Sequence, residues 1–170
     1  MNSKPKKSAR SFALAALLGA AAVLPAFAVW KVADRLPALG SFQLEGAVPA
    51  LAGRVTLVDF WASWCGPCKH SFPELDKLQK TYGERGLTIV AVSVDEKGEA
   101  MDKFLKEHPV TFSTVRDASQ KLVTAAGVES MPTSFLVDRK GVIRFAHMGF
   151  RGAESVKQLQ QEIEQLLVEK

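Results

Sequence analysis

The hydrophobic pattern contains two continuous apolar runs that are typical of buried strands. Residues 55–61, VTLVDFW, and residues 86–95, GLTIVAVSVD, are rich in β-branched and other apolar side chains. Runs of this length with so few polar positions are typical of strands that helices cover on both faces. A third segment, FQLEG at residues 42–46, is a candidate for an edge strand.

Apolar residues that recur every three or four positions predict helices between and after these runs. One helix is expected over residues 65–82, and another is expected to end at His108, because Pro109 follows it. A short helix is expected at residues 122–126. A final helix carries its apolar face at Val156, Leu159, Ile163, Leu166 and Leu167.

The later part of the chain predicts a short strand and then a hairpin. Residues 111–117 are a candidate strand, and the runs at 133–138 and 142–148 are joined by a turn at residues 139–141. The order of these elements predicts an α/β fold, with a mixed central sheet and helices on both faces. We expect one domain over residues 31–170.

Residues 1–30 have the pattern of an export signal or a membrane anchor. A basic segment, KPKKSAR, precedes an uncharged stretch at residues 11–30, and Ala26-Phe27-Ala28 has the small-x-small pattern of a cleavage site. Because roughly 20 apolar residues can span a bilayer, a retained anchor is the alternative to a cleaved signal peptide. Both alternatives place the domain outside the cytoplasm, in the periplasm or on another extracytoplasmic face. We therefore exclude these residues from the predicted fold.

Charge adds little beyond this N-terminal signal. The 170-residue chain carries 22 basic and 18 acidic residues, a net charge of +4. Four of the basic residues lie before residue 29, where there is no acidic residue, so the remaining chain is balanced. It has no basic stripe of the kind that a nucleic-acid-binding protein needs, and we expect no nucleic-acid partner.

The two cysteines lie within the segment WASWCGPC, as Cys65 and Cys68. A disulfide between them closes so small a loop that it adds only about 2 kcal/mol of stability, against roughly 4.7 for a hundred-residue loop. A structural zinc site needs four ligands, and His70, His108 and His147 are not at ligand spacing. The spacing therefore favours redox chemistry, with no metal and no cofactor other than the disulfide itself.

The position of the pair supports this interpretation. Cys65 stands where the first strand passes into the first helix, and the free N–H groups of a helix N-terminus stabilise a thiolate. A thiolate is the nucleophile in disulfide exchange. Cys68 is expected one turn further along the helix and less exposed, so that it attacks Cys65 and releases the reduced partner. Pro67 is well placed in a first helical turn.

Three segments resemble a known family. VDFWASWCGPCK at residues 58–69 closely resembles the active-site segment of thioredoxin. Residues 92–108 and MPTSFLVDRKGVIRFAHMGF at residues 131–150 are similar to exported thiol–disulfide oxidoreductases of the TlpA/ResA type. The resemblance covers residues 40–170 and implies a thioredoxin fold.

The resemblance also implies how a client binds. It implies a cis peptide bond between Met131 and Pro132 beside the cysteines, where the neighbouring backbone pairs with an extended substrate segment. Trp61 and Trp64 are expected to form the aromatic rim of the site, with core packing as the alternative for Trp61. The residues expected to bind the client are Trp64, Gly66, Pro67, Met131 and Pro132.

Two acidic residues are expected to act with the cysteines. The resemblance implies a buried acid at Asp59 that exchanges a proton with Cys68, and the alternative is an outward-facing strand residue. Glu96 aligns with a glutamate that such proteins hold near the active site, and the alternative is an ordinary solvated loop charge.

The expected function is the reduction of disulfides in client proteins. The resemblance implies a membrane thiol carrier as electron donor, possible membrane anchoring, and client roles such as cytochrome c biogenesis within cell redox homeostasis. The alternatives are an oxidase or isomerase of the same fold, or a non-catalytic copper-binding assembly factor that uses the two thiols as soft ligands.

Overall fold

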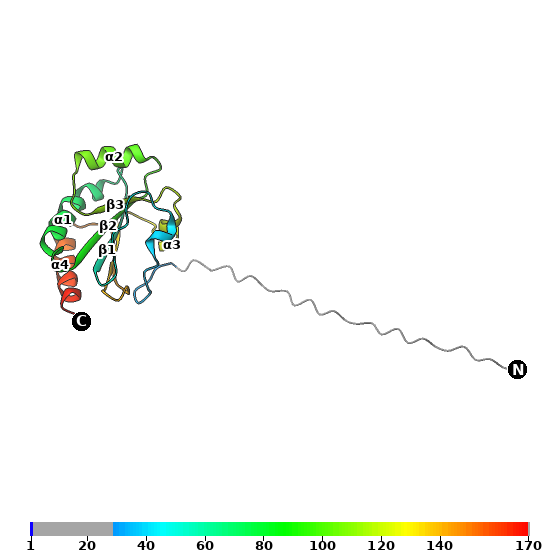
Figure 1. Ribbon diagram of the computed structural model, residues 1–170. Helices are drawn as coiled ribbons and strands as arrows, with labels where there is room; N and C mark the ends of the chain where they lie inside the picture. The colour runs from blue at the N-terminus through cyan, green and yellow to red at the C-terminus, as the bar shows by residue number, and fades with distance from the viewer. Residues whose placement is uncertain (2–28, 170) are drawn as a thin grey trace.

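A five-stranded mixed sheet forms the centre of the molecule in the computed structural model, which describes Met1 and residues 29–169 (Figure 1). The strands are β1 (Val55–Trp61), β2 (Leu87–Ser93), β3 (Ser113–Arg116), β4 (Thr133–Val137) and β5 (Ile143–Met148). Their order across the sheet is β3-β2-β1-β4-β5. β1, β2 and β3 run parallel, whereas β4 is antiparallel to both β1 and β5, so the predicted mixed sheet is confirmed.

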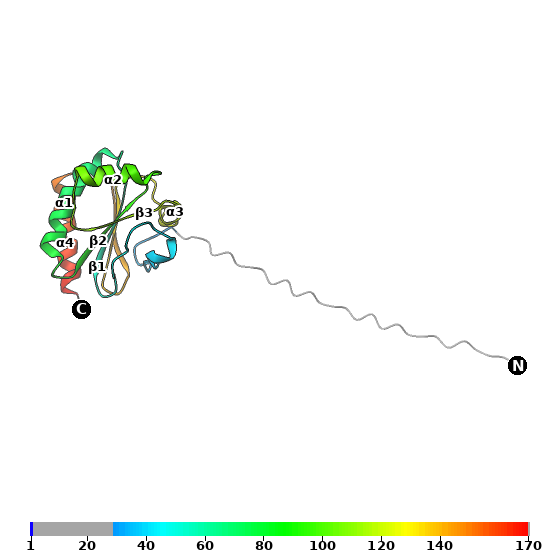
Figure 2. The ribbon, with the colours of Figure 1, turned by 45° about the horizontal axis from the view of Figure 1, so that its top comes forward.

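Helices cover both faces of this sheet. They are α1 (Gly66–Tyr82), α2 (Gly98–Glu107), α3 (Lys121–Ala126) and α4 (Ala153–Val168), with a short 3-10 helix, η1 (Leu39–Phe42). α1 and α4 lie side by side on one face, and α3 and η1 lie on the other (Figures 1 and 2). The predicted helices are confirmed, with ends that differ from the expected ones by a few residues.

Successive residues of β1 pack on opposite faces of the sheet, because successive side chains of a strand point in opposite directions. The ring of Trp61 packs against Phe72 of α1 and Phe104 of α2, with centroids 4.4 and 4.7 Å away. The ring of Phe60 packs instead against Trp30 and Phe135 on the opposite face. Asp59 therefore shares a face of the sheet with Trp61.

Trp30, the last residue of the segment left out of the predicted fold, packs into the core. It is only 8% exposed and stacks edge-on against Phe60 and Phe135. The chain after it pairs with the start of β5, where the amides of Ala33 and Ile143 bond to the carbonyls of Ile143 and Asp34. The rest of the predicted signal or anchor falls in residues 2–28, outside the described residues. Within the described part of the chain, no helix is both long and apolar enough to cross a bilayer.

The predicted edge strand at residues 42–46 does not form. Gln43 and Gly46 have positive φ angles of 56° and 100°, and a strand cannot continue through such residues. Only Glu45 pairs with the sheet, through an isolated antiparallel bridge to Arg116. The apolar side chains Phe42 and Leu44 still pack against the core, which explains the misleading pattern.

The Trp30→Ala variant tests whether this residue belongs to the core. Truncating a buried aromatic side chain costs about 3–5 kcal/mol, so the free energy of unfolding in urea should fall by that amount. Val32→Ala is the matched control, because Val32 is 56% exposed, and its loss should be small. Equal small losses in the two variants would contradict the placement of Trp30.

Candidate functional site

Two loops that follow the parallel strands β1 and β2 form the candidate site. Parallel strands end at the same edge of a sheet, so residues 62–65 after β1 and residues 94–97 after β2 lie next to each other. Ligand sites of open α/β sheets are commonly found at this edge. The first loop leads into the two cysteines, and the second contains Glu96.

The cysteines lie at the N-terminus of α1, as predicted. Cys65 is the N-cap residue, and its sulfur accepts a hydrogen bond of 3.2 Å from the backbone amide of Cys68. The two residues form a disulfide. Cys65 is 4% exposed and Cys68 is fully buried, so an incoming group meets Cys65 first. Gly66 and Pro67, between the cysteines, are both exposed.

The two tryptophans of the motif have different environments. Trp64 is 70% exposed and stands beside the disulfide loop. Trp61 is fully buried between Phe72 and Phe104, so it belongs to the core and not to a rim. The aromatic rim predicted for both residues is therefore wrong for Trp61, whose place on the inner face of a central strand leaves it no route to solvent.

The peptide bond between Met131 and Pro132 is cis, as expected. Thr133, the next residue, pairs with Phe60, which places Pro132 at the carboxyl end of β1, near the start of the cysteine loop. The carbonyl of Pro132 accepts a hydrogen bond of 2.7 Å from the amide of Gly149. The hydroxyl of Thr133 donates a hydrogen bond, also of 2.7 Å, to the carbonyl of Ser130. This bond joins the residues on either side of the Met131–Pro132 pair.

A groove of about 520 Å³ joins several of the predicted site residues. Trp64 and Met131 contribute apolar surface to it, and Ser63 and Glu96 contribute polar groups. The side chain of Glu96 is exposed at this groove. The structure thus brings Glu96 to the same groove as Trp64 and Met131, while a chemical role for it stays a prediction.

Asp95, which is not among the predicted site residues, connects the two loops. Its carboxylate is 2% exposed and accepts hydrogen bonds from the amide of Ser63 at 3.0 Å and from its hydroxyl at 2.8 Å. It also accepts one from the hydroxyl of Ser93 at 2.8 Å. These bonds fix the chain two residues before Cys65. The sequence did contain a signal for this role, since Asp95 is a carboxylate that follows the buried strand β2 almost directly.

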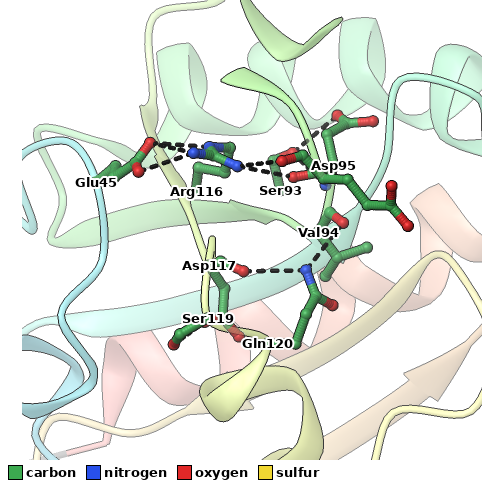
Figure 3. A network of polar contacts seen from close by, with 9 residues as sticks. Glu45, Ser93, Val94, Asp95, Arg116, Asp117, Ser119 and Gln120 are labelled. Carbon is green, nitrogen blue, oxygen red and sulfur yellow. Dashed lines mark hydrogen bonds and ion pairs between the residues drawn. The ribbon is translucent and has the colours of Figure 1, made fainter.

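Arg116 and Gln120 hold the backbone of the second loop (Figure 3). The guanidinium of Arg116 donates to both carboxylate oxygens of Glu45 at 2.8 Å, and to the carbonyls of Asp95 and Glu96 at 3.2 and 2.8 Å. The side-chain amide of Gln120 donates to the carbonyl of Val94 at 3.1 Å. The carbonyls of three successive residues of this loop are therefore bonded to side chains from β3 and from the start of α3.

Asp59 is buried and not outward-facing, which contradicts the alternative considered for it. The side chain is 1% exposed, and its Oδ1 accepts a hydrogen bond of 2.7 Å from the hydroxyl of Ser134. Burial raises the pKa of Asp59 from 3.8 to about 7, and the bond from Ser134 opposes this rise. A carboxyl group with such a pKa exchanges protons near neutral pH, although its exchange with Cys68 stays a prediction.

Within residues 29–169 and Met1, no group of three or more His, Cys, Asp and Glu side chains is arranged to hold a metal ion.

The Asp59→Asn variant tests the pKa of this carboxyl group through stability. The folded protein keeps the Asp59 proton that the unfolded chain releases, so the free energy of unfolding falls as pH rises from about 4 to 7. A rise in pKa from 3.8 to about 7 corresponds to roughly 4 kcal/mol. The variant lacks this pH dependence, because asparagine does not ionise. Its free energy of unfolding should therefore rise relative to that of the wild type as pH increases from about 4 to 7. Urea unfolding of both oxidised proteins at several pH values measures the difference, and parallel pH profiles would contradict it.

Known proteins with similar sequences include several that are named thiol-disulfide oxidoreductase ResA. The family model described as Redoxin matches residues 31–163. Thiol-disulfide oxidoreductase ResA from Geobacillus thermodenitrificans (strain NG80-2) is 33% identical over 119 residues, covering 68% of each chain. The protein of the same name from Bacillus subtilis (strain 168) is 36% identical over 93 residues, covering 55% of this chain and 52% of that one. The chain thus spans about half to two thirds of the length of these curated relatives.

Solved structures agree with the expected fold class. A Chlorobium tepidum protein assigned as a thiol:disulfide interchange protein DsbE is 37% identical, with a TM-score of 0.74, and the match covers 81% of this chain and 98% of that one. StoA from Bacillus subtilis is 28% identical, with a TM-score of 0.57 over 64% of this chain and 84% of that one. The expected thioredoxin fold is confirmed. Since the family model matches most of its length, the chain belongs to the Redoxin family, whose members are thioredoxin-like.

Proposed function

We propose that this protein is a thiol–disulfide oxidoreductase that acts outside the cytoplasm and reduces disulfides in client proteins. The observation that carries the proposal is the cysteine pair at the N-terminus of α1, joined as a disulfide beside the cis Met131–Pro132 bond. The names of the relatives support the reaction class, and the export pattern of residues 1–30 supports the location.

The reduced pair would carry out two successive exchanges. The Cys65 thiolate attacks one sulfur of the client disulfide, so that a mixed disulfide forms and the other client sulfur leaves as a thiolate, which takes up a proton. Cys68 then loses its proton and attacks the Cys65 sulfur, which releases the second client sulfur as a thiolate that also takes up a proton from solvent. Two electrons pass from the cysteine pair to the client, solvent protonates both client thiols, and the Cys65–Cys68 disulfide remains. Asp59 is proposed to accept the proton of Cys68.

The groove beside Trp64 suits an extended client segment. Trp64 and Met131 provide apolar contact, and Glu96 and Lys97 provide one charge of each sign. The exposed residues Gly66 and Pro67 leave the approach to Cys65 free of long side chains. The bonds from Asp95 and Arg116 hold the groove in place without the client, which lowers the ordering cost of binding.

The residues between the cysteines favour the reducing direction. A strong oxidant of this kind has a stabilised reduced form, with a thiolate of low pKa. Gly66 and Pro67 carry no charge and no side-chain donor, so the Cys65 thiolate relies mainly on the helix N-terminus. A reductant outside the cytoplasm needs a dedicated electron donor, and a membrane thiol carrier is the proposed one.

The Cys68→Ala variant should accumulate mixed disulfides through Cys65, because the resolving thiol is missing. Mass spectrometry of complexes separated without reductant would identify the clients. The Cys65→Ala variant is the matched control and should trap none of them. The assignment of roles would be reversed if Cys65→Ala trapped these partners and Cys68→Ala did not.

The reduction potential tests the direction of electron flow. We expect a value below about −200 mV, measured by equilibration with a glutathione redox series. A value near the roughly −120 mV of a strong oxidant would make the protein an oxidase instead. The Pro67→His variant should be more oxidising than the wild type, and an unchanged potential would show that these two residues do not set the direction.

A further inference from the structure

A row of polar side chains crosses the sheet from Asp59 to α4. Asp59 of β1 is the register partner of Ser134 of β4, and Ser134 is the partner of His147 of β5. Directly opposed residues of neighbouring strands project on the same face, so the three side chains lie in one line on the face that α1 and α4 cover. At its end, Nε2 of His147 lies 2.6 Å from Oε2 of Glu162 on α4. The side-chain amide of Gln158 donates to the other Glu162 oxygen at 3.0 Å.

A small cavity lies along this row. It has a volume of about 20 Å³, and Asp59, Ser71, Ser134, His147 and Ser155 line it together with apolar residues and Gly149. A cavity needs roughly 10–15 Å³ and two to four polar partners to hold a water molecule, so this one has the size and lining for a single water. Asp59 and His147 are its titratable lining residues, and α1 contributes Ser71 and Leu75.

One oxygen of Asp59 needs a partner. Oδ2 is buried and has no hydrogen-bond partner among the side chains and backbone that the structure describes, whereas Oδ1 is bonded to Ser134. Buried polar atoms in folded proteins are bonded to protein or to ordered water in the large majority of cases. A water molecule in the cavity would provide the missing bond.

The row also leads from the interior toward solvent. Asp59 is 1% exposed, Ser134 is 8% exposed, and the side chain of His147 is 18% exposed. An imidazole passes protons readily near neutral pH, because one ring nitrogen can accept while the other donates. His147 therefore has the position and the chemistry to connect Asp59 with solvent.

We propose that His147, held by Glu162, is the positioning residue through which Asp59 returns its proton to solvent, with one water in this cavity between them. The proposal rests on the proposed function, in which Asp59 receives the proton of Cys68. The proton moves from the Asp59 carboxylic acid to the water and on to His147. The ring nitrogen that is not bonded to Glu162 takes up this proton, and a proton then leaves through Nε2 and the Glu162 carboxylate to solvent, so that the Asp59 carboxylate is restored. No electrons move in this step, and no bond other than those to the proton changes.

The site lies one helical turn from the second cysteine. Ser71, which lines the cavity, donates a hydrogen bond of 3.1 Å from its hydroxyl to the carbonyl of Cys68. The alternative exit for the proton is back past the cysteines, through the groove beside Trp64. Replacement of His147 distinguishes the two exits, because only the exit through His147 needs its imidazole ring.

The His147→Gln variant removes the titrating ring and keeps a polar side chain, and His108→Gln is the matched control at the end of α2. In single-turnover experiments above pH 7, release of the reduced client should slow about tenfold in His147→Gln, with a larger solvent deuterium isotope effect. Formation of the mixed disulfide should not change, and added imidazole buffer should restore part of the lost rate. His108→Gln should release the client at the wild-type rate.

A carboxyl-carbon NMR titration of Asp59 provides a readout that needs no client. In the wild type the Asp59 signal should show a second inflection from the charge change at His147, and His147→Gln should lose it while His108→Gln keeps it. If His147→Gln does not fold, Glu162→Gln serves instead and should shift that second inflection. A crystal structure should contain an ordered water that bridges Asp59 Oδ2 and His147.

The release rate, the Asp59 titration and the crystal structure each test whether the proton leaves through His147. If the wild type exchanges disulfides but His147→Gln matches the control in release rate, isotope effect and Asp59 titration, the proton does not leave through His147. A cavity without water in the crystal would overturn the proposal as well. If the wild type exchanges no disulfides, the proposed function fails, whereas the Asp59 titration still tests the connection to His147.

Discussion

The position of β1 between β2 and β4 is the constraint on which the rest of the structure depends. Parallel pairing with β2 brings the loops after both strands to one edge, where Trp64, the residue before Cys65, lines the groove. Antiparallel pairing with β4 places Pro132 at the same edge and Ser134 opposite Asp59. A slip of one residue in this register would turn Asp59 toward the aromatic cluster around Phe60 and dismantle the site.

The burial of Asp59 has two opposing consequences, one for the stability of the domain and one for proton exchange. A carboxylate without full hydrogen bonding is costly in the interior, and here it has one bond, to Ser134. The protein therefore loses stability when the group ionises, and it gains an acid that can exchange protons near neutral pH. This combination suits a thiol pair that must alternate between protonated and disulfide states, whose second member, Cys68, is fully buried.

The sequence predicted most of the fold, because the apolar periods of strands and helices are local signals. It also predicted the position of Cys65, since a strand followed by a helix places the motif at their junction. The position of Asp95 after a buried strand was a local signal, but its partner Ser63 and the pairing of His147 with Glu162 were not predictable, because only the folded sheet brings these segments together. The apolar run at 42–46 was misread as a strand, because two left-handed backbone positions leave no trace in a hydrophobic pattern.

Cys65 is proposed as the attacking thiol and Cys68 as the protected one, and alkylation of the reduced protein distinguishes these roles without a client. A short pulse of iodoacetamide at pH 7, followed by mass spectrometry of the peptide that contains both residues, gives the modified fraction of each sulfur. Since Cys65 caps the helix N-terminus and Cys68 is fully buried, we expect modification almost entirely at Cys65. Equal modification of the two cysteines, or faster modification of Cys68, would contradict it.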